Sequence, residues 1–181
     1  MDAGRECPAK KSPRAVKGVW SQGHPISGWA RKLGVAMDVR LRPYNARDFG
    51  FARKLYFETM RWVIERVFGW DQSRQDASFA EWFQPAEVSV ITADGLDVGW
   101  IQQRIDHNGI LLGSIYVAPA MQRKGIGSRV IRALLDVGRQ QSKAVTLAVM
   151  KINPALALYE RLGFRITHED EYKVYLRADP N

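Results

Sequence analysis

The stretch "VAPAMQRKGIGSRVIRALLD", residues 117–136, places two glycines one residue apart, just after Gln122-Arg123-Lys124 and just before a helical run. Glycines let a backbone approach a ligand closely, and the N–H groups and dipole of a helix N-terminus attract negative charge. Arg and Lys add formal positive charge. The stretch therefore predicts a loop that holds a phosphate or pyrophosphate. Judged on its own, it is equally compatible with a tight turn on a solvated surface.

Two well-known nucleotide-binding patterns do not fit this loop. A Walker loop needs Lys and then Ser or Thr after its last glycine, but Gly127 is followed by Ser128-Arg129. The dinucleotide fingerprint needs a third glycine where this chain has Val130, and it expects strand–helix–strand units on both sides. We therefore exclude both classes of nucleotide-binding loop.

The segment before the loop alternates apolar and polar residues with a period of two. "EVSVITADGLDVGWIQQRIDHNGILLGSIYVAP" predicts three strands, at 87–92, 97–105 and 110–117. Asp94-Gly95 and Asn108-Gly109 are dipeptides that favour tight hairpins. An antiparallel meander is expected to run directly into the glycine loop.

The remaining segments predict an α/β fold with a mixed sheet. "VRLR" (39–42) has the pattern of a short strand, and Asn45 is expected to cap one long helix or two consecutive helices over 46–68. Asp71 is expected to cap a further helix. Beyond the loop we expect, in chain order, a helix from Ser128, a buried strand at 144–150, a helix starting at Asn153-Pro154 and stopping at Gly163, and strands near 164–167 and 171–177.

Two motifs in this order resemble the GNAT superfamily of acyl-CoA-dependent N-acyltransferases. "VAPAMQRKGIGS" (117–128) is similar to motif A of that family, with Gln122, Gly125 and Gly127 at its pattern positions. "NPALALYERLGF" (153–164) is similar to motif B, in which an Asn opens a helix and a Tyr follows one to two turns later. The resemblance covers roughly residues 38–177. It implies a mixed, mostly antiparallel central sheet flanked by helices, with splayed fourth and fifth strands that admit the coenzyme.

The resemblance also implies acetyl-CoA as the acyl donor and assigns roles to residues. Backbone N–H groups from Gln122 to Ser128 would bind the pyrophosphate, and the Val117 N–H would polarise the thioester carbonyl. Tyr159 would protonate the departing thiolate as a general acid. The implied coenzyme-binding residues are Ile115, Tyr116, Val117, Gln122, Arg123, Lys124, Gly125, Ile126, Gly127, Ser128 and Asn153.

Some positions keep an alternative interpretation. Tyr159, surrounded in sequence by Leu and Phe, would be read as core packing without motif B. Many relatives carry a Glu on the fourth strand, but "ILLGSIYV" has no carboxylate, so the general base stays open among Glu58, Glu65, Asp71, Asp106, His107 and ordered water. An aromatic segment lies where the family builds its acceptor pocket, and core packing is expected for at least two of its members, Trp62, Phe68 and Trp70.

The basic charge is concentrated in the first 36 residues. Formal net charge is +8, of which residues 1–36 contribute +5 through seven Lys/Arg and two acids. This distribution argues against a nucleic-acid-binding domain, which remains the third hypothesis. The segment lacks a sustained apolar period and a secretory centre, so we predict a disordered basic extension, or residues upstream of a start at Met37. Residues 37–181 would form the acyltransferase domain.

Metal and membrane sites are not predicted. Cys7 is the only cysteine, and His24, His107 and His168 lack the spacing of a helical metal pair. Apolar runs stay well below the ~20 residues that cross a bilayer, so a soluble protein is expected. The single cysteine fits a reducing compartment, so a cytoplasmic protein is expected. The acceptor stays open among polyamine, amino sugar, peptide N-terminus and protein lysine, and homodimerisation is equally undecided. The alternative function is a module that senses acyl-CoA without transferring the acyl group.

Overall fold

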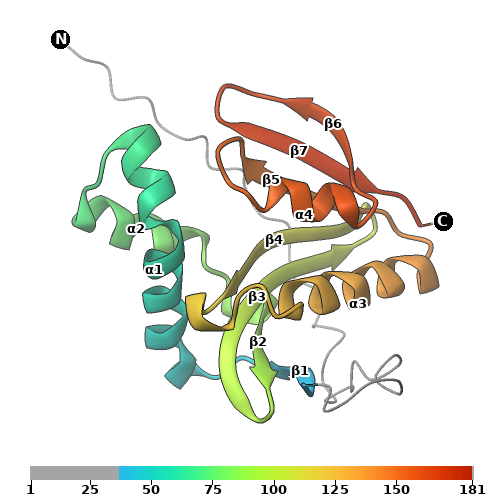
Figure 1. The fold of residues 1–181 in the computed structure, drawn as a ribbon, viewed down its shortest axis with the longest axis horizontal. Helices are drawn as coiled ribbons and strands as arrows, with labels where there is room; N and C mark the ends of the chain where they lie inside the picture. The colour runs from blue at the N-terminus through green and yellow to red at the C-terminus, as the bar shows by residue number, and fades with distance from the viewer. Residues whose placement is uncertain (1–36, 181) are drawn as a thin grey trace.

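A seven-stranded mixed sheet forms the centre of the computed structural model, which describes residues 37–180 (Figure 1). The predicted extension at 1–36 lies outside the described residues. The strands are β1 (Val39–Pro43), β2 (Val88–Ala93), β3 (Leu96–Asp106), β4 (Gly109–Val117), β5 (Val145–Met150), β6 (Arg165–Glu169) and β7 (Lys173–Ala178). The helices are α1 (Phe49–Phe68), α2 (Gln72–Trp82), α3 (Ile126–Gln140) and α4 (Leu156–Arg161), with short 3-10 turns η1 (Ala46–Asp48), η2 (Pro85–Glu87) and η3 (Pro119–Met121).

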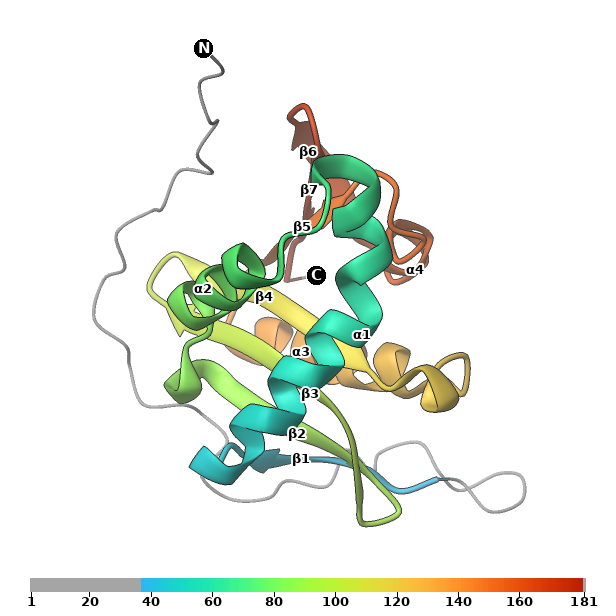
Figure 2. The same ribbon diagram turned by 90° about the vertical axis from the view of Figure 1, so that its left-hand side faces the viewer.

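The strands lie in the order β1-β2-β3-β4-β5-β7-β6. Every neighbouring pair is antiparallel except β4 and β5, which are parallel. α1 and α2 lie on one face of the sheet, and α3 and α4 lie on the other (Figures 1 and 2). The expected α/β fold with a mostly antiparallel sheet is therefore confirmed. None of the described helices combines the length and the apolar composition that crossing a membrane requires.

Side chains at the helix starts explain where α1 and α2 begin. Asn45 and Asp48 form a reciprocal capping box at η1, which leads into α1. Asp71 Oδ1 accepts the Arg74 N–H at 2.7 Å and caps α2. The polar cap residues predicted from the sequence are confirmed.

The two hairpins differ in their turns. Asp94 and Gly95 have φ of 49° and 81°, the left-handed pair that a tight two-residue turn requires. The second hairpin turns at His107-Asn108, and Gly109 already pairs with Asp106 as the first residue of β4. The hairpin was predicted correctly and its turn residues were not. Glycine is needed at position 109 because a Cβ there would lie 2.8 Å from the carbonyl oxygen of Ala144, the residue before β5.

α4 begins later and ends where predicted. The helix starts at Leu156 and not at Pro154, because Asn153 forms a turn first: its Oδ1 accepts the Ala155 N–H at 3.0 Å. At the other end Gly163 has φ 93°, and the Phe164 N–H donates to the Tyr159 carbonyl at 3.1 Å. This is a Schellman ending, with its usual contact between the two flanking apolar side chains.

Two apolar clusters cover the two faces of the sheet. The larger packs α3 and α4 against the sheet and includes Ile101, Ile131 and Leu134, all 1% exposed or less. The smaller packs α1 and α2 against β3 around Trp100, which is fully buried. The sheet thus separates the two apolar clusters. A gap between two of its strands would join the two faces of the sheet.

Candidate functional site

β4 and β5 part in the middle of the sheet. They pair only through Ile110–Val145, Leu111–Thr146 and Leu112–Leu147. β4 then continues to Val117 and β5 to Met150 without further pairing between them. The parting coincides with a bulge in β4: against β3, Gln103 faces Leu112 and Gln102 faces Ser114, which leaves Gly113 as the extra residue. Because a bulge bends its strand, it accounts for the gap between β4 and β5, and the predicted splay of the fourth and fifth strands is confirmed.

The free edge of β4 presents backbone donors to this gap. The Ala118 N–H donates to the Val98 carbonyl at 2.8 Å, toward β3. Successive N–H groups of a strand point to opposite sides, so those of Ile115 and Val117 point away from β3. In the described part of the chain no strand pairs with this edge. The gap therefore contains two N–H groups that are free to bind a ligand.

The glycine loop lies directly beyond the end of β4. Arg123 and Gly125 have left-handed φ values of 61° and 81°, and α3 begins at Ile126. The Arg129 N–H makes the first helical bond, to the Gly125 carbonyl at 3.0 Å. The N–H groups of residues 126–128 precede it, so they are the orphan donors of this helix start. They make a site where an anion is favoured.

Gln122 connects the loop to the strand. Its side-chain Nε2 donates to the Val117 carbonyl at 2.9 Å, and its backbone N–H donates to the Ala118 carbonyl at 3.1 Å. Gln122 therefore positions the loop, and its own N–H is already engaged. Arg123 and Lys124 are exposed beside the loop and add positive charge there.

Tyr159 lies on the α3 face of the sheet. It is 7% exposed and packs edge-to-face on Phe164, with ring centroids 5.8 Å apart. Burial raises the pKa of its hydroxyl to about 12. The group is therefore a neutral proton donor at physiological pH.

Tyr116 comes to the gap from the opposite face. Its ring packs on Trp100 and Tyr56, with centroids 4.8 and 5.6 Å away. Burial raises the pKa of Tyr116 well above its ordinary range, and Tyr56 and Tyr159 raise it further. The Tyr116 N–H points toward β3, as that of Ala118 does, so the free edge of β4 is lined by the N–H groups of Ile115 and Val117 and not by that of Tyr116.

The predicted Asn153 lies on the β5 side of the gap, three residues beyond the strand end. Its side-chain oxygen is used in capping Ala155. The two motifs thus meet at the same end of the sheet, one after each of the parted strands.

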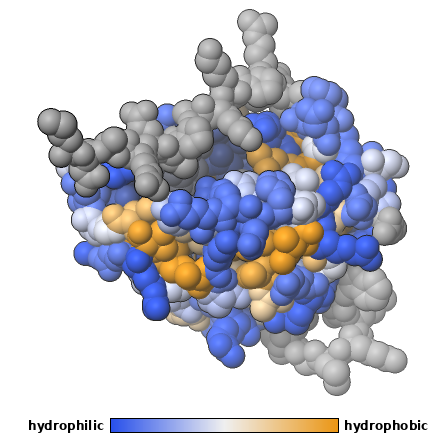
Figure 3. All heavy atoms as spheres, turned by 90° about the horizontal axis from the view of Figure 1, so that it is seen from above, coloured by the Kyte–Doolittle hydropathy of each residue, from blue (hydrophilic) through white to orange (hydrophobic). Residues whose placement is uncertain are grey.

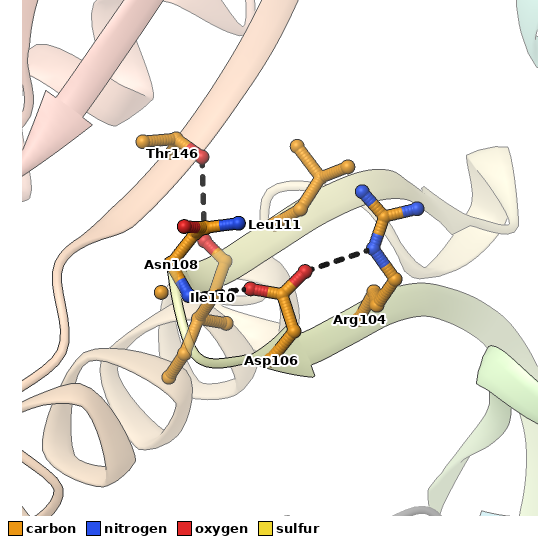
Figure 4. Close-up of a pocket in the computed structure, with 7 residues that line it drawn as sticks. Arg104, Asp106, Asn108, Ile110, Leu111 and Thr146 are labelled. Atoms are coloured by element: carbon orange, nitrogen blue, oxygen red, sulfur yellow. Dashed lines mark hydrogen bonds and ion pairs between the residues drawn. The ribbon is translucent and has the colours of Figure 1, made fainter. Parts of the chain in front are cut away.

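The base candidates are distributed over the molecule. Asp106 and His107 lie at the β3–β4 hairpin, at the opposite end of β4 from Val117. Asp106 ion-pairs with Arg104 at 3.4 Å and borders a cavity of about 170 Å³ with Leu111 and Thr146 (Figure 4). The structure does not bring these two residues to the gap. Of the others, Glu58 is exposed on α1, Glu65 accepts a hydrogen bond from Arg61, and Asp71 caps α2.

The aromatic segment contributes less to the core than expected. Trp70 packs on Phe57, with centroids 5.6 Å apart, in the smaller core. Trp62 and Phe68 are 46% and 54% exposed. The expectation that at least two of the three fill the core is wrong. Val63 and Ile64 are buried directly after Trp62, so Trp62 lies on the outer face of α1, and Phe68 is the last residue of that helix.

Two residues near the gap were not predicted as part of the site: Tyr56, which contacts Tyr116, and Gly113, the extra residue of the bulge. A glycine inside a strand is a signal for a bulge, so Gly113 could have been found.

Comparisons with known proteins agree with this geometry. Residues 51–164 match the model of the acetyltransferase (GNAT) family. A mycothiol acetyltransferase from Acidimicrobium ferrooxidans is 32% identical over 157 residues, which cover 77% of this chain and 50% of that protein. The chain thus spans about half the length of that relative.

Solved structures share the fold at low sequence identity. An N-acetyltransferase (PaiA) from Thermoplasma acidophilum, solved in complex with coenzyme A, has a TM-score of 0.66 at 16% identity and covers 79% of this chain and 99% of its own. The ribosomal-protein-S18-alanine N-acetyltransferase from Escherichia coli has a TM-score of 0.59 at 18% identity, with 79% and 94% covered.

Proposed function

Because the chain belongs to the acetyltransferase (GNAT) family, we propose that it transfers an acetyl or other short acyl group from acyl-CoA to a primary amine. The supporting observation is the position of the gap between β4 and β5. It leaves the Ile115 and Val117 N–H groups unpaired, immediately before a loop whose helix start favours an anion. Acyl-CoA offers a partner for each feature: its thioester carbonyl accepts hydrogen bonds, and its pyrophosphate, at the other end of the pantetheine arm, is an anion.

In this proposal acetyl-CoA lies between the parted strands. Its pyrophosphate binds the N–H groups of residues 123–128, with Arg123 and Lys124 adding charge and Gln122 holding the loop. Its pantetheine arm runs along the backbone of Ile115 to Val117, with Asn153 on the far side of the gap. The other half of the length of the mycothiol acetyltransferase has no counterpart in this chain, so that relative's acceptor is not carried over.

The chemistry follows from these positions. The neutral amine nitrogen attacks the thioester carbonyl carbon, and the carbonyl electron pair moves to oxygen, where the Val117 N–H stabilises the charge. The intermediate collapses, the C–S bond breaks, and the coenzyme A thiolate takes the Tyr159 proton. The amine proton is released to water, and Tyr159 is reprotonated from solvent. No covalent intermediate on the protein is required.

Calorimetric titration with acetyl-CoA and a thiol-release screen over a panel of amines test the proposal. The panel contains a polyamine, an amino sugar, a peptide N-terminus and a lysine peptide. We expect binding of acetyl-CoA and thiol release with at least one amine. No binding at high micromolar acetyl-CoA would remove the proposal. Binding without thiol release for any amine would favour the acyl-CoA sensor instead.

A further inference from the structure

A cavity lies on the sheet away from the glycine loop, at the end where β4 and β5 are still paired. Arg104 of β3, Leu111 of β4 and Thr146 of β5 are neighbours in the register, so their side chains lie in one row on the same face of the sheet. Together with Asp106 and the hairpin turn that follows it, they line a cavity of about 170 Å³ (Figure 4).

This row lies on the side of the sheet that carries α1 and α2. Arg104 points to the same face as Gln102, two residues earlier, and the Gln102 side chain donates to the carbonyl of Trp82, at the end of α2, at 3.2 Å. β4 and β5 are central strands, yet the side chain of Leu111 is 37% exposed. The two helices therefore leave this part of the face uncovered.

Exposed hydrophobic residues do not by themselves indicate a site in this protein. On the face seen from above they form separate areas between hydrophilic ones (Figure 3). Scattered residues of this kind are ordinary on protein surfaces. Leu111 alone would belong to the same class, so the indication of a ligand has to come from a charged group beside it.

The guanidinium of Arg104 is that charged group. Its Nε is buried, donates no hydrogen bond within the described residues, and lies 3.4 Å from Asp106 Oδ2 in an ion pair. In Figure 4 the two terminal nitrogens point away from Asp106, to the side of Leu111. A guanidinium presents its N–H donors as a rigid fork. Over residues 37–180 the donors on the terminal nitrogens of Arg104 have no acceptor.

The two carboxylates nearest to Arg104 are engaged elsewhere. Asp106 Oδ1 accepts the Asn108 N–H at 2.8 Å, and Oδ2 faces the Arg104 Nε. Glu87 Oε2 accepts the Gln102 side-chain amide at 3.3 Å. Burial raises the pKa of Glu87, and Arg104 lowers it in part from a longer distance. Neither carboxylate therefore forms the bidentate pair that the terminal nitrogens of a guanidinium offer.

A carboxylate from outside the described chain fits this arrangement. A cavity of about 150 Å³ can hold a molecule of about six carbon atoms, so about 170 Å³ is enough for a short carboxylic acid. We propose that the cavity is a binding site for a small monocarboxylate, with Arg104 holding the carboxylate and Leu111 and Thr146 contacting an apolar body. Such a ligand would contact β3, β4 and β5 at Leu111–Thr146, the middle one of the residue pairs that join β4 to β5.

Nuclear magnetic resonance titration of the full chain tests the site with two matched probes, isovalerate and its uncharged amide isovaleramide. We expect isovalerate to give saturable amide shifts at residues 104–111 and 146. Isovaleramide should bind at least about tenfold more weakly, because it cannot form a charge-assisted bidentate pair. Arg104→Gln should reduce this preference to within about twofold.

The matched control is Arg40→Gln, because Arg40 is also a strand arginine that pairs with an aspartate two residues away, at 2.7 Å. This variant should keep the tenfold preference. Leu111→Trp fills the cavity and leaves Arg104 and Asp106 in place, so it should abolish the isovalerate shifts even if Arg104→Gln fails to fold.

Three results would overturn the inference. In the first, isovalerate gives no saturable shift up to about 50 mM, or binds no better than its amide. In the second, Leu111→Trp or a folded Arg104→Gln keeps the preference. In the third, the shifts centre on residues 122–128, which would assign the anion to the start of α3. These results do not depend on acetyl transfer, so they leave the proposed function to its own test.

Discussion

At the scale of single residues, the proposed chemistry depends on groups that side-chain identity does not reveal. In the proposed mechanism Val117 would act through its backbone N–H, whose direction is set by strand alternation from the Ala118–Val98 bond. Tyr159 would act through a hydroxyl whose pKa is raised by burial. The first proposed role depends on the backbone N–H, which proline lacks, and the second depends on the side-chain hydroxyl, which phenylalanine lacks.

Val117→Pro removes the N–H that faces the gap and places the proline ring at that edge, with φ fixed at about −65°. Since that N–H takes no part in the ladder with β3, the strand should still form. We expect kcat to fall about 10²- to 10³-fold with acetyl-CoA still bound, measured by thiol release and calorimetry. Tyr116→Pro is the contrasting variant, because its N–H points toward β3 and its loss should destabilise the sheet itself. Near-normal kcat in Val117→Pro would contradict the oxyanion role.

Tyr159→Phe removes the proposed proton donor and keeps the ring contact with Phe164. We expect kcat to fall about 10²-fold at an unchanged dissociation constant for acetyl-CoA. The hydroxyl donates while it is protonated, which holds below a pKa of about 12 and is lost above it. The unmodified protein should therefore show no loss of kcat from this group up to about pH 10. A variant with full turnover would show that Tyr159 serves packing alone.

At the scale of elements, two glycines shape the site by different means. Gly113 inserts the bulge that separates β4 from β5. Gly125 takes a left-handed conformation at the end of the loop, and α3 begins at the next residue. In the proposed complex the first would create the space for acetyl-CoA, and the second would direct the helix start toward its pyrophosphate.

Gly125→Ala tests the second role. No atom lies within 4 Å of the added Cβ, so its cost comes from the φ of 81° and should be about 1–2 kcal/mol of unfolding free energy. Acetyl-CoA should bind more weakly, because relief of this strain moves the donors of the helix start. Urea unfolding and calorimetry measure the two effects. Gly127→Ala is the matched control: its φ is not positive, the nearest side chain is 3.9 Å away, and stability should be kept. Equal behaviour of the two variants would refute the account.

At the scale of the whole molecule, the smaller core attaches α1 to the sheet. Trp100 of β3 is fully buried and donates its indole N–H to the Ala52 carbonyl of α1 at 3.0 Å. The same ring packs on Tyr116, next to the gap. The smaller core therefore attaches α1 to the sheet near the start of the helix, and at its end Phe68 contacts Tyr172.

Trp100→Phe should destabilise the fold by about 1–3 kcal/mol, through the lost hydrogen bond and the space left in the core. Urea unfolding followed by circular dichroism measures the change. Trp62→Phe provides the comparison, since an exposed side chain should alter the free energy of unfolding by less than about 0.5 kcal/mol. A similar loss in both variants would show that Trp100 is not the anchor of α1.

Most of the fold could be predicted from the sequence, because local rules set it. Polar caps at Asn45 and Asp71, the dipeptide Asp94-Gly95 and the period-two pattern of the meander each act over a few residues. The errors concern details that neighbouring residues do not set. The second hairpin turns at His107-Asn108, one residue earlier than the dipeptide Asn108-Gly109 indicates, and Gly109 lies close to Ala144 of a distant segment. Trp62 lies on the outer face of α1 and Phe68 at its end, so both are exposed.

By itself the sequence determined the order of the elements and the motifs at 117–128 and 153–164, since caps, turns and periodicity depend on neighbouring residues. Only the tertiary structure decided that β4 and β5 part after Leu112, which backbone donors face the gap, and that Phe68 meets Tyr172. These features join residues far apart in the chain. Their geometry follows from the register of the sheet and the length of α1, and no local pattern records either.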